Sequence, residues 1–254
     1  MIRSGDRSEW KYLVSTGDGE ASDTFDFGDS VIKLSSDLGK VTDWFAPSNW
    51  AELDKSDTDL ASVGPSVLIN YHEIVSDDGM KNHSNTTDTS NVFQIGKEGV
   101  GFLLDGNKLG GINGQIFSAQ VCDRGAYGGI GYSGPYLYVP CREGLVALYL
   151  QSSSAVAASA GSNNTANVSG SNAYSAFTVK WKGPSFQAGP RIVANGLVWT
   201  VDIKDGQLYA FNQSTGEIKF QEDLGDVVHF TTPSSSHGQI FVAASNNVLS
   251  FSIK

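Results

Sequence analysis

Several features that mark other classes of protein are scarce in this chain of 254 residues. Apolar residues do not recur at helical spacing over any long window, which argues against a mainly α-helical fold. No apolar run approaches the ~20 residues that a membrane-spanning helix needs. The two cysteines, Cys122 and Cys141, are too few for a small fold built on disulfides. Only 17% of the residues are charged, and the formal net charge is −10.

The negative charge excludes some classes of partner. Phosphate backbones and anionic membrane surfaces repel an acidic chain, so we expect no nucleic-acid partner and a tolerance for cations. The amino end, Met1 to Arg7, carries basic residues but no apolar segment follows it, so no signal peptide is recognised. Two interpretations remain open at this point: a cytoplasmic chain, or a true start that lies upstream.

The chain is rich in the residues of short strands and turns. It has 29 glycines and 11% aromatic residues. Short runs rich in Val, Ile, Leu, Phe and Tyr alternate with Gly, Asp, Asn and Ser, which is typical of strands joined by tight turns. We therefore predict an all-β fold. Clear examples of such runs are Val100–Leu104, Leu145–Tyr149, Leu197–Val201, Gln207–Phe211 and Asn247–Phe251.

The strands follow a repeat whose clearest copy runs from Gly189 to Phe220. Units of ~40–50 residues with four short strands each are typical of β-propeller blades, which bury their faces by stacking on their neighbours. We predict one propeller domain over 1–254, with about four to five four-stranded antiparallel blades. Its ring is either incomplete or closed by pairing of the first and last strands, because an open ring exposes sheet edges. The predicted units are a partial blade at 1–60, blades at 61–122, 123–186 and 187–226, a partial blade at 227–254, and a flexible Ser/Ala/Asn-rich insertion at 152–175.

The segment Leu208–Phe220 closely resembles the repeat of the pyrroloquinoline quinone (PQQ)-like β-propeller family, "LYALDxxTGKxxW". Asn212 and Phe220 replace the usual Asp and Trp. The resemblance extends over essentially the whole chain, and it implies the propeller fold. It does not imply one activity, because the family includes quinoprotein dehydrogenases, outer-membrane assembly lipoproteins and extracellular sensor propellers. Many of its members bind no quinone.

A second resemblance concerns the quinoprotein alcohol dehydrogenases within this family. Three stretches are similar in order to their central segment: Ser15–Gly19, Gly28–Leu34 and Asp57–Asp59. The resemblance implies that Asp18 and Asp59 are Ca²⁺ ligands and that Asp57 is the catalytic base. Lys97, in a stretch similar to "GKxGxxYVLDR", would contact the quinone. Asp18 stands where the family has Asn, and the first half of the family's ring has no counterpart here.

Each of these residues also has a simpler interpretation. Carboxylates in polar loops bind a hard cation through oxygen, or they are solvated and cap turns. Lys97 contacts an anion, or it is a turn residue between two strands. Cys122 and Cys141 form a disulfide between two blades, which implies an oxidising compartment, or they are two buried thiols. The histidines show no metal-ligand spacing, and His229 faces the central channel or lies in the core.

Three hypotheses for function follow. The first is an extracytoplasmic propeller of quinoprotein descent that acts as a binding or scaffold module, without a complete catalytic site. The second is a PQQ- and Ca²⁺-dependent alcohol or sugar dehydrogenase, or its carboxy-terminal part. The third is a purely structural protein-interaction module. The expected partner is a protein or a small alcohol or sugar, and convergence of the carboxylates on Lys97 would favour the second hypothesis.

Overall fold

The computed structural model describes residues 12–20, 24–68, 72–75, 81–84, 91–152 and 174–252. Apart from its two ends, the predicted insertion at 152–175 lies outside these residues. Helical structure in the described part is limited to α1 (Trp50–Lys55) and the 3₁₀ turn η1 (Leu60–Ser62). Neither is long and apolar enough to cross a membrane.

Antiparallel sheets account for most of the described chain, which confirms the prediction of an all-β propeller fold. The second sheet has the order β10 (Phe117–Gln120), β8 (Val100–Asp105), β7 (Asn91–Ile95) and β4 (Ser66–Leu68). The third sheet has the order β11 (Gly131–Ser133), β12 (Tyr136–Cys141), β13 (Gly144–Ser152) and β14 (Tyr174–Lys182). The fourth sheet has the order β15 (Ala188–Ala194), β16 (Leu197–Asp202), β17 (Gln207–Asn212) and β18 (Ile218–Asp223).

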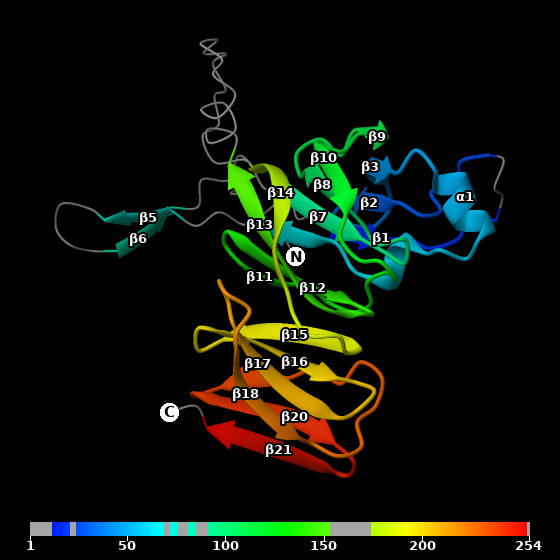
Figure 1. Ribbon diagram of the computed structural model, residues 1–254. Coiled ribbons are helices and arrows are strands. Elements are labelled where there is room, and N and C mark those ends of the chain that lie inside the picture. Colours follow the sequence, from blue (N-terminus) through cyan, green and yellow to red (C-terminus); the bar gives the residue numbers. More distant parts are fainter. Residues whose placement is uncertain are drawn as a thin grey trace.

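Shorter assemblies complete the architecture. The fifth sheet has three strands, β19 (Ser234–Ser236), β20 (Gln239–Ala244) and β21 (Asn247–Ser252). A separate hairpin pairs β5 (His72–Val75) with β6 (Lys81–Ser84). Figure 1 shows the sheets following one another in chain order, from blue to red, with the first and fifth sheets at opposite ends. Among the described residues β1 and β21 do not pair, so the closed-ring clasp is not formed there.

The first sheet departs from the regular pattern. It contains β1 (Tyr12–Ser15), β2 (Val31–Leu34), β3 (Val41–Ala46) and β9 (Gly111–Ile112). β9 follows β8 in the chain, yet it pairs in parallel with β3, with Phe45 opposite Gly111. Gly110 has a positive φ of 92°, and a Cβ there would lie 2.9 Å from Gly114. The Gly-Gly sequence thus allows the tight loop that carries β9 to the neighbouring sheet.

Four hydrophobic clusters each join two consecutive sheets. Val31 and Phe45 of the first sheet pack with Phe102 and Leu104 of the second. Corresponding clusters join the second sheet to the third, the third to the fourth, and the fourth to the fifth. Burial between sheets, and not within one sheet, therefore forms the core, as expected for stacked blades.

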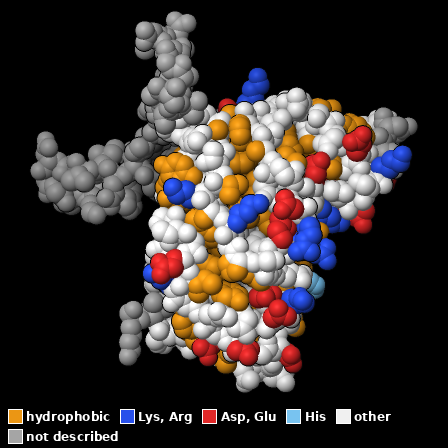
Figure 2. Space-filling model, viewed as in Figure 1, with side chains coloured by type: hydrophobic (Ala, Val, Ile, Leu, Met, Phe, Trp, Pro, Cys, Tyr) orange, Lys and Arg blue, Asp and Glu red, His pale blue; other side chains and the backbone are white. Residues whose placement is uncertain are grey.

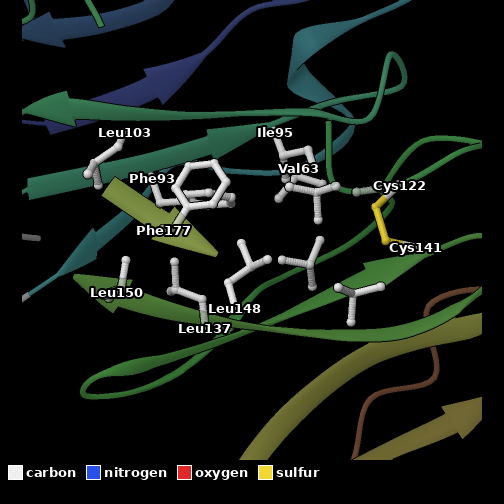
Figure 3. Close-up of a cluster of buried hydrophobic side chains, with 14 of the residues drawn as sticks. Val63, Phe93, Ile95, Leu103, Cys122, Leu137, Cys141, Leu148, Leu150 and Phe177 are labelled. Carbon is white, nitrogen blue, oxygen red and sulfur yellow. A yellow bond between two sulfur atoms is a disulfide. The ribbon is translucent and has the colours of Figure 1, made fainter. Parts of the chain in front are cut away.

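The predicted disulfide is present and joins the second and third sheets. Cys122 follows β10 and Cys141 ends β12, with their Cα atoms 5.2 Å apart. Both cysteines are fully buried. Figure 3 shows the bond at one end of the cluster that includes Ile95 and Val63.

The repeat motif itself acts as a contact between sheets. Asn212 stands in the place of the usual Asp and still supplies a side-chain oxygen for the turn. Its Oδ1 accepts hydrogen bonds from the backbone N–H groups of Ser214 and Thr215 at 3.0 Å. Gly216 has a φ of 72° and lies against the indole ring of Trp181 in β14, leaving no room for a Cβ. The Thr-Gly of the motif thus lets one sheet approach the aromatic ring of the preceding sheet.

Candidate functional site

The acidic residues predicted from the resemblance meet at one end of the first two sheets. Asp18 lies in the loop after β1, and Asp57 and Asp59 lie between α1 and η1. Lys97 occupies the turn between β7 and β8. The loops come close because Gly17 has no side chain, since a Cβ there would collide with Oδ1 of Asp59.

The four predicted residues converge. Asp18, Asp57 and Asp59 each place one carboxylate oxygen within 4.8 Å of the others. Nζ of Lys97 is 2.9 Å from Oδ1 of Asp57, and it also forms an ion pair with Oδ2 of Asp59. The same ammonium donates a hydrogen bond to the backbone carbonyl of Asp57 at 3.0 Å. Proximity is the condition that a shared site requires, but the catalytic and ligand roles of these residues stay predictions.

The charges of this cluster perturb one another. Hydrogen bonds to Asp59 and Asp57 raise the pKa of Lys97 above its ordinary value, so its ammonium stays protonated at neutral pH. Loss of solvation, followed by the negative charges of Asp59 and Asp57, raises the pKa of the Asp18 carboxyl. The side chain of Asp57 is 80% exposed, against 27% for those of Asp59 and Lys97. The cluster is therefore open to water on the Asp57 side.

The donor set fits a hard cation. Three carboxylates offer only oxygen ligands, which suit Ca²⁺ or a similar ion. Of the ligands implied by the resemblance, Asp18 remains free of Lys97, whereas Asp59 is paired with it. A cation would therefore share Asp59 with the lysine ammonium, and Lys97 already balances part of the negative charge.

Two further carboxylates border this cluster, and sequence reasoning assigned them no role. Oδ1 of Asp29 accepts a hydrogen bond from the backbone N–H of Leu60 at 2.8 Å. Oδ1 of Asp54, on α1, accepts one from the N–H of Gly19 at 2.5 Å. Asp18, Asp29 and Asp54 each place an oxygen within 4.8 Å of the others. Burial raises the pKa of Asp29 to about 6, although the Leu60 N–H lowers it.

Two adjoining hollows lie near Arg142. The first, of about 220 Å³, is lined by residues including Tyr127, Arg142, His229 and Phe230. The second, of about 270 Å³, shares Arg142 and adds the charged side chains of Arg124, Asp202, Lys204 and Asp205. Gly125 links Lys97 to this region. It packs on the Lys97 carbonyl, and its own carbonyl accepts a hydrogen bond from the N–H of Arg142 at 2.9 Å. Neither hollow is lined by Asp57 or Lys97.

His229 is exposed and lines the first hollow. It therefore does not lie in the core, which was one of its two predicted positions. Val228 and Phe230 beside it are 74% and 60% exposed. On the face drawn in Figure 2, acidic and basic side chains are interspersed and form no large region of one sign.

The sheets and their stacking define the class of protein: a β-propeller. Comparison with solved structures supports this fold. The chain is similar to BamB from Moraxella catarrhalis, with a TM-score of 0.54 and 11% identity over 94% of this chain and 54% of that one. It is similar to a europium-containing methanol dehydrogenase, with a TM-score of 0.52 and 14% identity over 93% of this chain and 48% of that one.

A third similar structure is the quinohemoprotein alcohol dehydrogenase ADHIIG from Pseudomonas putida HK5, with a TM-score of 0.51 and 12% identity over 85% of this chain and 38% of that one. The chain thus spans about half or less of the length of these structures. No protein-family profile matches the sequence. No curated protein matches it either. At these identities the similarity shows the fold alone.

Proposed function

We propose that this chain is an extracytoplasmic β-propeller of quinoprotein descent that acts as a binding or scaffold module. The proposal rests on the exposure of the Asp57 side chain and on its ion pair with Lys97. That side chain is 80% exposed and is paired with Lys97 at 2.9 Å. A general base works best in a site that excludes water and leaves its carboxylate free to take a proton. Asp57 therefore fits a surface ion pair better than a catalytic base.

The disulfide supports the extracytoplasmic location. Cys122 and Cys141 are joined and fully buried. Disulfides persist in oxidising compartments such as the periplasm and the extracellular space. A protein secreted or held at the cell surface would keep this bond throughout its life.

The first hollow offers a surface for a protein partner. It is concave, and Val228 and Phe230 expose large apolar side chains at it and beside it. Arg142 and His229 add hydrogen-bond donors to the same lining. Apolar anchors surrounded by polar groups are the usual composition of the centre of a protein interface.

The partner surface can be tested by capture from a cell-envelope extract with variants. Val228→Asp and Phe230→Ala should abolish capture of the partner, because both remove apolar area at the hollow. Val248→Asp is the matched control, since Val248 is 72% exposed on β21, away from the hollow. Equal loss in all three variants, or in none, would contradict the assignment of this surface.

A second function, a PQQ- and Ca²⁺-dependent alcohol or sugar dehydrogenase, is favoured by the convergence of the carboxylates on Lys97. In that case Asp18 and Asp59 would hold the cation, Asp57 would accept the hydroxyl proton of the substrate, and Lys97 would bind the quinone. The bound quinone would supply the acceptor for the hydride. Two similar structures are named as dehydrogenases, of methanol and of alcohols.

Reconstitution distinguishes the two functions. The protein is incubated with PQQ and Ca²⁺, PQQ binding is followed by absorbance, and dye reduction is measured with alcohols and sugars. A binding module should show no PQQ-dependent dye reduction. Dye reduction that is lost in Asp57→Asn and kept in Glu222→Gln, an exposed carboxylate of β18, would overturn our proposal.

A further inference from the structure

One carboxylate oxygen near the candidate site is buried without a partner. Asp29 is fully buried, and its Oδ1 is satisfied by the N–H of Leu60. Its Oδ2 accepts no hydrogen bond. A buried carboxylate oxygen without a donor is costly, so such atoms call for a specific explanation.

The unpartnered oxygen belongs to a group of three carboxylates. Asp29, Asp54 and Asp18 place one oxygen each within 4.8 Å of the others. Two oxygens bound to one Ca²⁺ at ~2.4 Å are at most about 4.8 Å apart, so the spacing of the three carboxylates is compatible with one shared ion of this size. Asp18 is exposed, which leaves one side open for water ligands.

In the described part of the chain, no ion pair neutralises this group. Lys97 forms its ion pairs with Asp57 and Asp59. Among the residues that the structure describes, no Lys, Arg or His forms an ion pair with Asp18, Asp29 or Asp54. Three adjacent carboxylates repel one another, because the positive charge of Lys97 acts on Asp18 more weakly than the neighbouring carboxylates do. A bound divalent ion would remove that repulsion.

We propose that Asp29, Asp54 and Asp18 form a site for a divalent cation that prefers oxygen ligands, with Ca²⁺ as the occupant. Asp29 is the buried anchor, held in place by the N–H of Leu60, and its Oδ2, which accepts no hydrogen bond, is the oxygen left to bind the ion. Asp54 is held by the N–H of Gly19. The site differs from the ligand pair implied by the family resemblance, Asp18 and Asp59, and it shares only Asp18 with it.

Terbium ions provide a direct test, because Tb³⁺ occupies Ca²⁺ sites and is excited through nearby tryptophan. Trp50 lies one helical turn before Asp54 on α1, and its ring contacts Phe25 in an aromatic group that also contains Trp44. Tryptophan-sensitised Tb³⁺ luminescence is titrated in the metal-free protein and then displaced with Ca²⁺. We expect saturable luminescence that Ca²⁺ reverses.

Variants decide between this site and its neighbour. Asp29→Asn and Asp54→Asn should each weaken Tb³⁺ and Ca²⁺ affinity by about 10-fold or more, because each removes a charged ligand. Asp57→Asn, which lies outside the proposed group, should change affinity by less than about threefold. Asp37→Asn is the control for an exposed carboxylate at a distant turn.

Three outcomes would overturn the proposal. Asp29→Asn could bind both ions as the original protein does. Asp57→Asn could weaken binding as much as Asp29→Asn, which would place the ion beside Lys97. All four variants could behave alike, which would indicate nonspecific binding to an acidic surface. A second readout guards against misfolding: Ca²⁺ should raise the Tm of the original protein and of Asp37→Asn, but not that of Asp29→Asn.

Discussion

Removal of the disulfide between the second and third sheets should destabilise the protein by a calculable amount. Cys122 and Cys141 are 19 residues apart in sequence. Closing a loop of this length restricts the unfolded chain by an entropy worth about 3 kcal/mol at 25 °C. Folded domains have free energies of unfolding of about 5–15 kcal/mol, so this loss is a large fraction of the total. The double variant Cys122→Ala/Cys141→Ala should show the whole of this loss in its free energy of unfolding.

The assay is urea denaturation followed by tryptophan fluorescence, for the two single variants and the double variant. Each single variant already breaks the cross-link, so each should lose about 3 kcal/mol and the double variant little more. The sum of the single losses should therefore exceed the double loss by about 3 kcal/mol. A reductant should lower the stability of the original protein and leave the double variant unchanged. Additive single effects, or losses below about 1 kcal/mol, would refute the reasoning.

Three further predictions test other contacts. Lys97→Met should cost no more than about 1 kcal/mol, measured by urea denaturation, and the cost should shrink in high salt, because Asp57 is mostly exposed and the pairs with Asp57 and Asp59 are screened by solvent. Burial raises the pKa of the Tyr138 hydroxyl in the folded protein. As the pH rises above about 10, Tyr138 therefore ionises in the unfolded chain while it stays protonated in the folded one, and the free energy of unfolding falls. Tyr138→Phe should weaken that fall when unfolding is compared at pH ~8 and ~11. Gly206→Ala should lower the free energy of unfolding by about 1–3 kcal/mol, because Gly206 has a positive φ of 66° and faces a backbone carbonyl; an unchanged Tm would contradict this.

The propeller fold could be predicted because its signals are local. Gly206 and Gly216 adopt the positive φ values that the repeat's turns require, and Asn212 caps one of these turns through its own side chain. Such turn chemistry depends on neighbours in the sequence, so it can be seen without the structure. The parallel pairing of β9 with β3 could not be predicted, because a two-residue strand has no periodicity.

The candidate site was predictable only in part. The resemblance to the quinoprotein alcohol dehydrogenases implies roles for Asp18, Asp57 and Asp59, and the structure brings these residues together with Lys97. Asp29 lies in a stretch that carries the resemblance, yet the sequence assigns it no role. Asp29 is buried and accepts a hydrogen bond from the N–H of Leu60, a tertiary contact that no local pattern encodes. A Gly-Asp-Ser sequence looks like an ordinary solvated turn until that contact is known.

The successive stacking of sheets has a consequence for how the protein opens. Because each hydrophobic cluster joins only two neighbouring sheets, local unfolding can start at an end of the stack and advance one sheet at a time. Within the described residues, the three-stranded β19–β21 sheet packs in one hydrophobic cluster, with the fourth sheet, whereas each sheet joined by the disulfide packs in two clusters and is also held by a covalent bond. Amide hydrogens of β20 and β21 should therefore exchange with solvent deuterium well before those of β12 and β13.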